Sequence, residues 1–205
     1  MPPLDHFRFL APIYRYLVPA PQPDELQRAL QLPISGTLLD IGGGTGRVTA
    51  QFVDQVGQIV IADPSTAMLR QTVEHPRLHR VAALAEQLPF ADAAFARIVM
   101  VDALHHVQDV PQALHELLRV LAPDGRLLIQ EPDWRKWSMR LVSWGEKLAL
   151  MRPQPHPPDE ILKMARRAGG RAHCLGSGRF TAWIVAEHAV TEHSLSEHSA
   201  RELPS

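Results

Sequence analysis

The stretch LLDIGGGTGRV, from Leu38 to Val48, places four glycines and a threonine directly after a short apolar run. The run Thr37–Ile41 has the composition of a buried strand, and Val48, Phe52 and Val56 follow the glycines at helical spacing. Glycine is needed where a turn is tight or where a ligand lies against the backbone. The start of a helix also offers N–H groups that have no partner within the helix. The stretch therefore predicts a strand, a ligand-binding loop and a helix.

An acid follows at the end of the next apolar run. The run Gln58–Ala62 ends at Asp63, about twenty residues beyond the glycine loop, which is the spacing expected of a ribose-binding acid. A carboxylate at this place can accept hydrogen bonds from both ribose hydroxyls. In an open α/β sheet, ligands bind at the carboxyl ends of the strands, where the strand order reverses. The loop and the acid together predict a nucleoside-binding site.

Two classes of cofactor contain such a ribose. A nicotinamide dinucleotide fold requires the pattern G-x-G-x-x-G around a pyrophosphate. In this chain the glycines fall at Gly42, Gly44 and Gly46, so the third comes one residue early, and Asp40 precedes the loop. An acid at that place repels pyrophosphate and can receive the ammonium group of a methionine moiety. The pattern favours S-adenosylmethionine, with a nicotinamide-dependent oxidoreductase as the alternative.

The rest of the chain alternates between apolar and amphipathic runs, which is typical of βαβ units and a parallel sheet. The runs are apolar throughout rather than alternating, as expected of strands covered by helices on both faces. The last two strands are joined by too short a connection for a crossover helix, so we expect them to pair antiparallel. The predicted fold is a Rossmann-like, doubly wound α/β fold with a mostly parallel seven-stranded sheet and an antiparallel C-terminal strand. The predicted strands are Thr37–Ile41, Gln58–Ala62, Arg80–Ala83, Ala96–Val101, Arg126–Gln130, Ala172–Leu175 and Thr181–Glu187. Helices are predicted over Asp24–Leu32, from a Ser65 cap through Val73, around Leu114–Leu121, and from an Asp159 cap to Gly169.

Composition limits the class of protein further. The chain has 205 residues and a formal net charge of -1, which predicts one core and no nucleic-acid partner. Cys174 is the single cysteine, so a disulfide within the chain and a cysteine-rich metal site are excluded. The N-terminus has no signal-peptide pattern and no apolar run is long enough to span a membrane, so we expect a cytoplasmic protein. Three Glu-His pairs near the C-terminus recur every five residues and share no face of a helix or strand, so no metal site is predicted there.

Four segments resemble class I S-adenosylmethionine-dependent methyltransferases, especially the group that includes the ubiquinone and menaquinone methyltransferases. The resemblance covers roughly Tyr14 to Asp133. Its motifs are LLDIGGGTGRV, IADPSTAML from Ile61 to Leu69, AEQLPFADAAFARIVMVDALHHVQD from Ala85 to Asp109, and LLRVLAPDGRLLIQEPD from Leu117 to Asp133. It implies a single methyltransferase domain over residues 1–188, with a helical lid at 1–32, and a polar tail at 189–205.

The resemblance also implies roles for individual residues. The methionine part of the cofactor would lie on Asp40 and the loop glycines Gly42, Gly43, Gly44 and Gly46, with Asp102 near its amino-acid end. Asp63 would hold the ribose hydroxyls. Pro64 and Met68 would pack near the adenine, and the backbone N–H of Ala85 would bond to it. Relatives often carry an acid where this chain has Leu84, so at this position we expect apolar and backbone contact with the adenine. Tyr14 resembles a tyrosine that closes over the methyl group.

Candidate catalytic residues follow the fourth and fifth strands. His105 or His106 could act as a general base or orient the acceptor, because histidine titrates near neutrality; equally, the pair could only end a strand. Glu131 and Asp133 could hold the acceptor or a loop, or serve as caps. Three tryptophans beyond them, Trp134, Trp137 and Trp144, could line an acceptor pocket or pack in the core.

The sequence therefore predicts methyl transfer from S-adenosylmethionine to a small-molecule acceptor, apolar or aromatic in character. A nicotinamide-dependent oxidoreductase and a non-catalytic S-adenosylmethionine-binding protein are the alternatives. The sequence predicts neither the atom that is methylated nor the oligomeric state.

Overall fold

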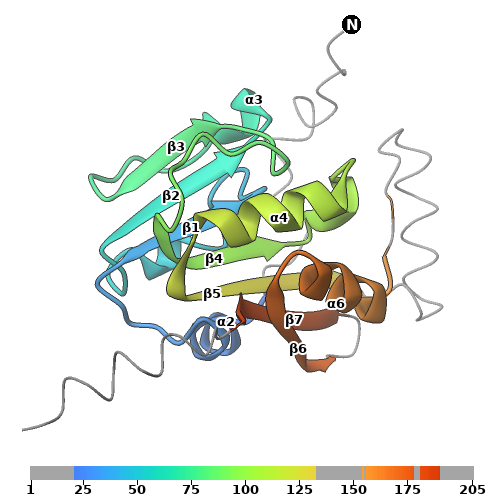
Figure 1. The fold of residues 1–205 in the computed structure, drawn as a ribbon. Helices are drawn as coiled ribbons and strands as arrows, with labels where there is room; N and C mark the ends of the chain where they lie inside the picture. Colours follow the sequence, from blue (N-terminus) through green and yellow to red (C-terminus); the bar gives the residue numbers. More distant parts are fainter. Residues whose placement is uncertain (1–20, 133–153, 155, 178–180, 190–205) are drawn as a thin grey trace, which may run out of the picture.

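The computed structural model describes residues 21–132, 154, 156–177 and 181–189. Within these residues the chain forms a seven-stranded sheet with helices on its faces (Figure 1). The strands are β1 (Thr37–Ile41), β2 (Gln58–Asp63), β3 (Leu78–Ala82), β4 (Phe95–Val101), β5 (Leu121–Pro132), β6 (Gly170–Ser177) and β7 (Thr181–His188). The helices are α2 (Pro23–Leu30), α3 (Thr66–Leu69), α4 (Val110–Val120) and α6 (Pro158–Arg167), with short 3-10 helices η1 (Ala50–Phe52) and η2 (Leu104–His106).

The strand order is β3-β2-β1-β4-β5-β7-β6. Strands β1 to β5 pair in parallel, and β7 is antiparallel to both of its neighbours, β5 and β6. The predicted mostly parallel, seven-stranded sheet with an antiparallel C-terminal strand is confirmed. From β1 the chain moves outward to β2 and β3, then returns to place β4 on the other side of β1. The strand order therefore reverses between β1 and β4, which is where ligands bind in sheets of this kind.

Two apolar clusters, one on each face, explain why the central strands are mostly apolar. Along β4, Ile98 and Met100 join one cluster, whereas Val99 and Val101 join the other. The first cluster is completed by α4 and α6, which cover the face turned toward the viewer in Figure 1. The second includes α2 and the segment that follows the glycine loop. Most residues of the central strands are thus buried by one layer or the other, whereas the edge strands β3 and β6 keep exposed positions such as His79, Arg80 and His173.

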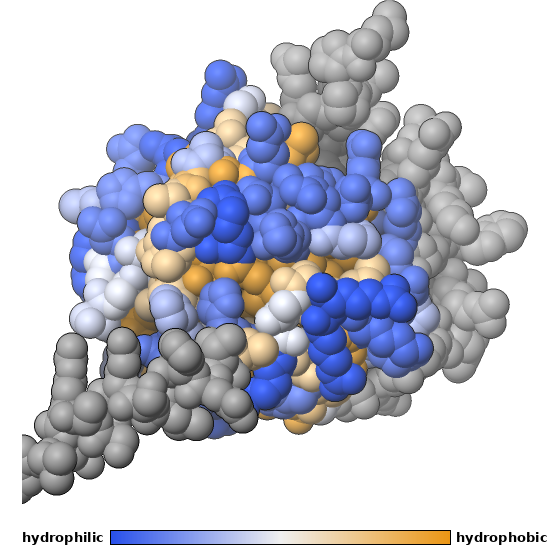
Figure 2. Space-filling view, viewed as in Figure 1, coloured by the Kyte–Doolittle hydropathy of each residue, from blue (hydrophilic) through white to orange (hydrophobic). Residues whose placement is uncertain are grey.

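The outward side of α4 is polar. Its exposed positions include Gln112 and His115, whereas Leu114, Leu117 and Leu118 are buried. Figure 2 shows the resulting hydrophilic band across this face of the molecule. The 3.6-residue period of the apolar side chains therefore places the helix correctly on the sheet.

The prediction of an amphipathic helix after the glycine loop is wrong. Val48, Phe52 and Val56 are buried, as the spacing predicts, with 6%, 1% and 3% of their surfaces exposed. The backbone, however, makes i to i+3 hydrogen bonds, from Phe52 N to Thr49 O at 2.9 Å and from Gln55 N to Phe52 O at 2.8 Å. These bonds are typical of turns and 3-10 helix. A spacing of four positions between buried apolar residues does not by itself decide between an α-helix and a series of turns with a short 3-10 helix.

Other helices differ from expectation at their ends: α2 ends at Leu30 rather than at Leu32. The Ser65 hydroxyl accepts a hydrogen bond from Met68 N at 3.3 Å, which confirms the predicted cap, but α3 ends at Leu69 rather than at Val73. Asp159 does not cap α6: it lies in the first turn, after Pro157 at the N-cap. Proline suits helix starts because its missing N–H would be unpaired there in any case.

The described part of the expected lid packs against the sheet. Leu26 and Leu30 of α2 are fully buried. Two arginines of the sheet bind the last carbonyls of the helix, from Arg97 Nε to Leu30 O at 2.6 Å and from Arg126 Nη1 to Ala29 O at 3.2 Å. Cations at a helix C-terminus are favourable to its dipole. Residues 1–20 of the expected lid and residues 190–205 of the tail lie outside the described residues.

Candidate functional site

A cavity of about 570 Å³ lies at the carboxyl ends of β1, β2 and β4 and against the loop after β3. It includes the point between β1 and β4 at which the strand order reverses. The predicted site residues that line it are Asp40, Gly42, Gly43, Gly44, Asp63, Pro64, Met68, Leu84, Ala85, Asp102 and His106. Residues from three of the four motifs of the sequence thus meet at one edge of the sheet.

The glycine loop forms the floor of the cavity, and two of its glycines are required by geometry. Gly42 has a φ of +67°, and a Cβ atom built on it would lie 2.5 Å from the Cβ of Ala103. L-residues with side chains rarely adopt this conformation, and the close approach leaves no room for one. Gly46, with a φ of +71°, is not among the lining residues; its Cβ would meet Ile61 Cδ1 at 2.5 Å. Gly46 therefore serves the packing of the loop on β2.

Asp40 is the most buried of the acids in the cavity, with 1% of its surface exposed. Burial raises the pKa of its carboxyl from 3.8 to about 7, against the hydrogen bond from Thr49 and with a further increase from the nearby Asp63 charge. The positive charge of Arg47 lowers this pKa by a smaller amount. Thr49 Oγ1 donates to Asp40 Oδ2 at 2.6 Å and fixes the side chain. A cation next to Asp40 would stabilise its ionised form.

Asp63 is oriented by two backbone donors. Gly44 N donates to its Oδ2 at 3.0 Å, and Ser65 N donates to its Oδ1 at 2.7 Å. The first bond ties the acid to the glycine loop, and the second ties it to the start of α3. A carboxylate can accept more hydrogen bonds than these two. The side chain is therefore held in one orientation at the cavity wall, where a diol could bind.

The loop after β3 forms the wall beyond Asp63. Leu84 lies in this wall and is 55% exposed, and Ala85 beside it is buried. The loop is bound to α4: Leu88 N donates to Glu116 Oε2 at 2.9 Å, and Arg119 Nη1 donates to Phe90 O at 2.9 Å. This wall is thus fixed by hydrogen bonds to a packed helix.

The two adjacent histidines, His105 and His106, differ in their position and in their contacts. His105 is 3% exposed and is not among the lining residues; its Nδ1 lies 2.7 Å from Glu131 Oε2. His106 lines the cavity, and burial, with a smaller contribution from His105, lowers its pKa to about 3. A group with so low a pKa is a poor general base near neutrality. His106 is therefore better suited to orient an acceptor as a neutral hydrogen-bonding group.

Glu131 holds the end of β4 in place. Its Oε1 accepts from Ala103 N at 2.9 Å and from Leu104 N at 2.7 Å, while its Oε2 contacts His105. Of the roles considered for this acid, the structure supports the holding of a loop. Asp102, directly before this loop, has a φ of +50°, which aspartate tolerates better than most residues.

Sequence reasoning missed several residues of the site. Arg47, Glu86, Gln108 and Asp109 line the cavity, and Thr49 supports it from behind. Glu86 Oε1 accepts from Gln108 N at 2.9 Å, so it joins the two rims of the cavity. No periodicity in the sequence distinguishes these residues from other surface positions. Tyr14, Asp133, Trp134, Trp137 and Trp144 lie outside the described residues.

Acidic side chains outnumber basic ones among the described residues that line the cavity. Among the described residues that line it, the carboxylates are Asp40, Asp63, Glu86, Asp102 and Asp109, and the one guanidinium is Arg47.

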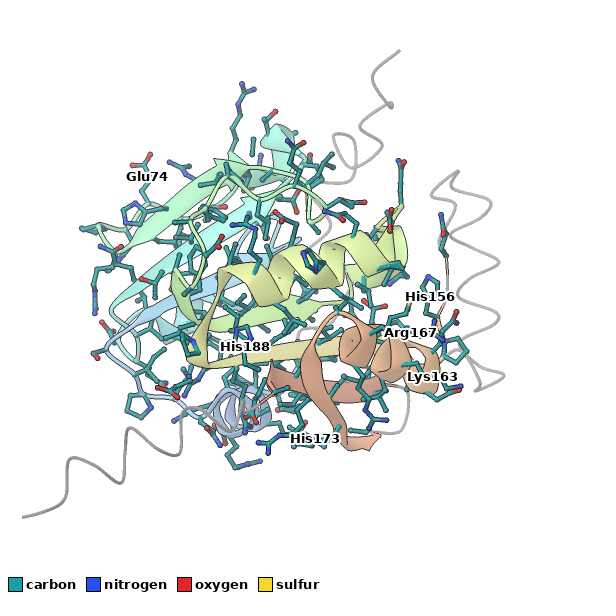
Figure 3. All side chains as sticks on the ribbon, viewed as in Figure 1. Glu74, His156, Lys163, Arg167, His173 and His188 are labelled. Atoms are coloured by element: carbon teal, nitrogen blue, oxygen red, sulfur yellow. The ribbon has the colours of Figure 1, made fainter. Side chains whose placement is uncertain are left out.

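No group of three or more potential metal ligands occurs in the described ranges. His156, His173 and His188 are separated from one another in Figure 3. Of the helices that the structure describes, none is long and apolar enough to cross a membrane.

Comparison with known proteins gives matches to methyltransferases. Residues 39–129 match the family described as methyltransferase domain. The ubiquinone/menaquinone biosynthesis C-methyltransferase of Klebsiella pneumoniae is 41% identical over 105 residues, which are 46% of this chain and 42% of that enzyme. The enzyme of the same name from Idiomarina loihiensis is 43% identical over 104 residues, 46% of this chain and 41% of that enzyme. The chain thus matches less than half the length of these relatives.

Solved structures share the fold. A SAM-dependent methyltransferase from Thermotoga maritima superposes with a TM-score of 0.70 at 21% identity, over 90% of this chain and 99% of that one. Another, from Aquifex aeolicus, gives a TM-score of 0.63 at 19% identity, over 80% of this chain and 88% of that one. At these identities the likeness concerns the fold alone.

Proposed function

Because the chain carries a methyltransferase domain of class I, we propose that it transfers a methyl group from S-adenosylmethionine to a small acceptor of apolar or aromatic character. The observation that carries this proposal is the charge of the cavity. Five carboxylates and one guanidinium line it among the described residues. S-adenosylmethionine has a sulfonium and an ammonium group, so its charge is complementary to these walls.

The same charge argues against a nicotinamide dinucleotide. A pyrophosphate carries two negative charges, and sites that bind it present backbone N–H groups and the positive end of a helix dipole. Here Asp40 lies directly before the loop, and a Cβ built on Gly43 would approach its carboxylate at 2.5 Å. Pyrophosphate on this loop would therefore lie against a carboxylate. Ionisation of Asp40 would make that contact more unfavourable.

Methyl transfer requires alignment and the exclusion of water more than it requires acid–base chemistry. S-adenosylmethionine supplies the methyl group already activated on a sulfonium. Asp40 and Asp102 would hold the ammonium end, and Asp63 would hold the ribose. His106, neutral because its pKa is low, would orient the acceptor by a hydrogen bond.

An apolar or aromatic acceptor is supported by the wall next to His106. Met100, Val101, Ala103 and Val107 line the cavity there. Apolar walls with few polar groups are usual in sites for such molecules. The relatives with 40% identity or more are named for ubiquinone and menaquinone biosynthesis, which agrees with an acceptor of this chemistry.

Calorimetric titration with S-adenosylhomocysteine and with NADPH tests the cofactor. We expect the first ligand to bind, and binding of NADPH alone would overturn the proposal. Asp63→Ala should lower the affinity for S-adenosylhomocysteine by about tenfold to a hundredfold, as expected for the loss of charge-assisted hydrogen bonds. Asp124→Ala, which changes an exposed acid after α4, is the matched control and should leave the affinity unchanged.

Labelled S-adenosylmethionine incubated with a metabolite extract distinguishes an enzyme from a silent binder. Transfer of label to an extractable small molecule is the expected result. Binding of S-adenosylhomocysteine without any transfer would support the non-catalytic alternative instead.

A further inference from the structure

The order of the strands determines where the parts of an adenosyl ligand lie, given the proposed function on which this inference rests. Asp40 and Asp102 both line the cavity where β1 adjoins β4, and Asp63 ends β2. The next strand outward is β3, at the edge of the sheet. A ligand with its amino-acid tail at the first junction and its ribose on Asp63 therefore extends its base toward the loop after β3.

The wall at that end is shared with a second hollow. Pro64, Ala83 and Leu84 line the main cavity and also line a hollow of about 460 Å³ beside it. Its other lining residues are Ala82, Gln87, Leu88 and Pro89. The two spaces are thus contiguous at the end where the base would lie.

The second hollow is apolar. Gln87 carries the one polar side chain among its described lining residues. Backbone groups there are already engaged, since Gln87 N donates to Leu84 O at 3.2 Å and Ala83 N donates to Asp63 O at 3.3 Å. Leu84 remains 55% exposed, one of only three large hydrophobic residues so exposed in the part of the chain that the structure describes. An apolar group placed in the hollow would cover it.

The hollow is held open by the packing of its loop. Arg119 Nη2 donates to Leu88 O at 3.2 Å, and Glu116 Oε2 accepts from Leu88 N at 2.9 Å. Both partners lie on α4, whose apolar side is buried in the first cluster. A ligand would therefore enter a formed surface without ordering the loop, which is favourable to affinity.

We propose that this second hollow is a subsite for an apolar group carried on the exocyclic amine of the ligand's adenine. The glycosidic bond is on one ring of adenine and the exocyclic amine is at the far end of the other. With the ribose on Asp63, the amine therefore points away from the main cavity and toward the shared wall. An alkyl or arylalkyl group on that nitrogen gains contact with Leu84 and loses no hydrogen bond to an acidic side chain. A carboxylate at position 84 would be desolvated by such a group, which is unfavourable.

The test compares two ligands on the full chain: S-adenosylhomocysteine, and the same molecule benzylated on the exocyclic amine. For the unaltered protein, calorimetry should give a higher affinity for the benzylated ligand, by up to about tenfold, the effect of covering part of an exposed leucine. Leu84→Asp should reverse this order and weaken the benzylated ligand about tenfold relative to the other. Leu175→Asp changes a leucine of similar exposure, 47%, on the opposite edge strand β6 and should leave the ratio unaltered.

Equal or weaker binding of the benzylated ligand, with S-adenosylhomocysteine still bound, overturns the subsite and leaves the proposed function standing. An unchanged ratio in Leu84→Asp also overturns it. Failure of both ligands to bind overturns the proposed function together with the subsite. Because Leu84 is exposed, the variant is expected to fold, and a melting curve checks that it does.

Discussion

The ionisation of Asp40 should set the pH dependence of both stability and ligand binding. Burial raises the pKa of this carboxyl from 3.8 to about 7. Between these two values the folded protein holds a proton that the unfolded chain has released, so this group makes the fold less stable as pH rises through the window from about 4 to about 7. The full loss, reached above pH 7, is on the order of 4 kcal/mol, since each pKa unit corresponds to about 1.4 kcal/mol.

Asp40→Asn isolates this effect. Asparagine keeps an oxygen that can accept the hydrogen bond of Thr49, but it does not titrate. The free energy of unfolding of the variant minus that of the parent should therefore rise by about 3 kcal/mol between pH 5 and pH 8. Glu116 and Glu187 have lowered pKa values; they stabilise the fold above their ordinary pKa and lose that effect at lower pH, equally in both proteins. Chemical unfolding at the two pH values gives the difference, and a difference that does not change with pH would refute the reasoning.

Ligand binding should show the opposite trend. A ligand ammonium favours the ionised carboxylate, so below pH 7 binding must release the proton of Asp40. Affinity for S-adenosylhomocysteine should then rise up to tenfold per pH unit from pH 5 and level off above pH 7. Calorimetry in buffers of different ionisation enthalpy should detect nearly one released proton at pH 6. An identical pH profile in Asp40→Asn would show that another group is responsible.

Two further substitutions test the walls of the cavity. Gly42→Ala places a Cβ 2.5 Å from that of Ala103 and should lower both the melting temperature and the affinity for S-adenosylhomocysteine; Gly169→Ala, with a φ of +99° but open space around it, should lower the melting temperature alone. Glu131→Ala leaves the N–H groups of Ala103 and Leu104 and the ring of His105 without their acceptor, which should cost about 3 kcal/mol of unfolding free energy. Glu187→Ala, on a more exposed acid, should cost about 1 kcal/mol, and equal losses in the two variants would contradict the structural role of Glu131.

The strands could be predicted from the sequence because each one is marked by the apolar composition of its own short run of residues. Apart from Arg97, the residues of β4 are apolar whichever face they join, and each predicted strand overlaps an observed one. The segment after the glycine loop could not be predicted in the same way. Val48, Phe52 and Val56 are buried as expected, but threonine and valine within the segment have low helix propensity, and tertiary packing selects turns and a 3-10 helix there.

The acids of the cavity were predictable for a related reason. Asp40 and Asp63 each occupy the end of an apolar run, and the carboxyl ends of parallel strands meet at one edge of the sheet. The supports behind them were not predictable. Thr49 reaches Asp40 only because the chain turns back after the loop, and Arg119 reaches the loop after β3 across 29 residues to Phe90. Contacts of this kind depend on how the elements pack.

The wall that carries His106 depends on a strand that does not line the cavity. In the pairing of β4 with β5, Val101 lies opposite Gln130, so Glu131 falls beside the residues that follow Val101. Its carboxylate then binds two consecutive backbone N–H groups and the ring of His105. With His105 held by Glu131, its neighbour His106 lines the cavity. A shift of one residue in this register would turn Glu131 to the other face of the sheet. The register of β5 therefore determines which histidine lines the cavity, and it explains why two adjacent histidines have different surroundings.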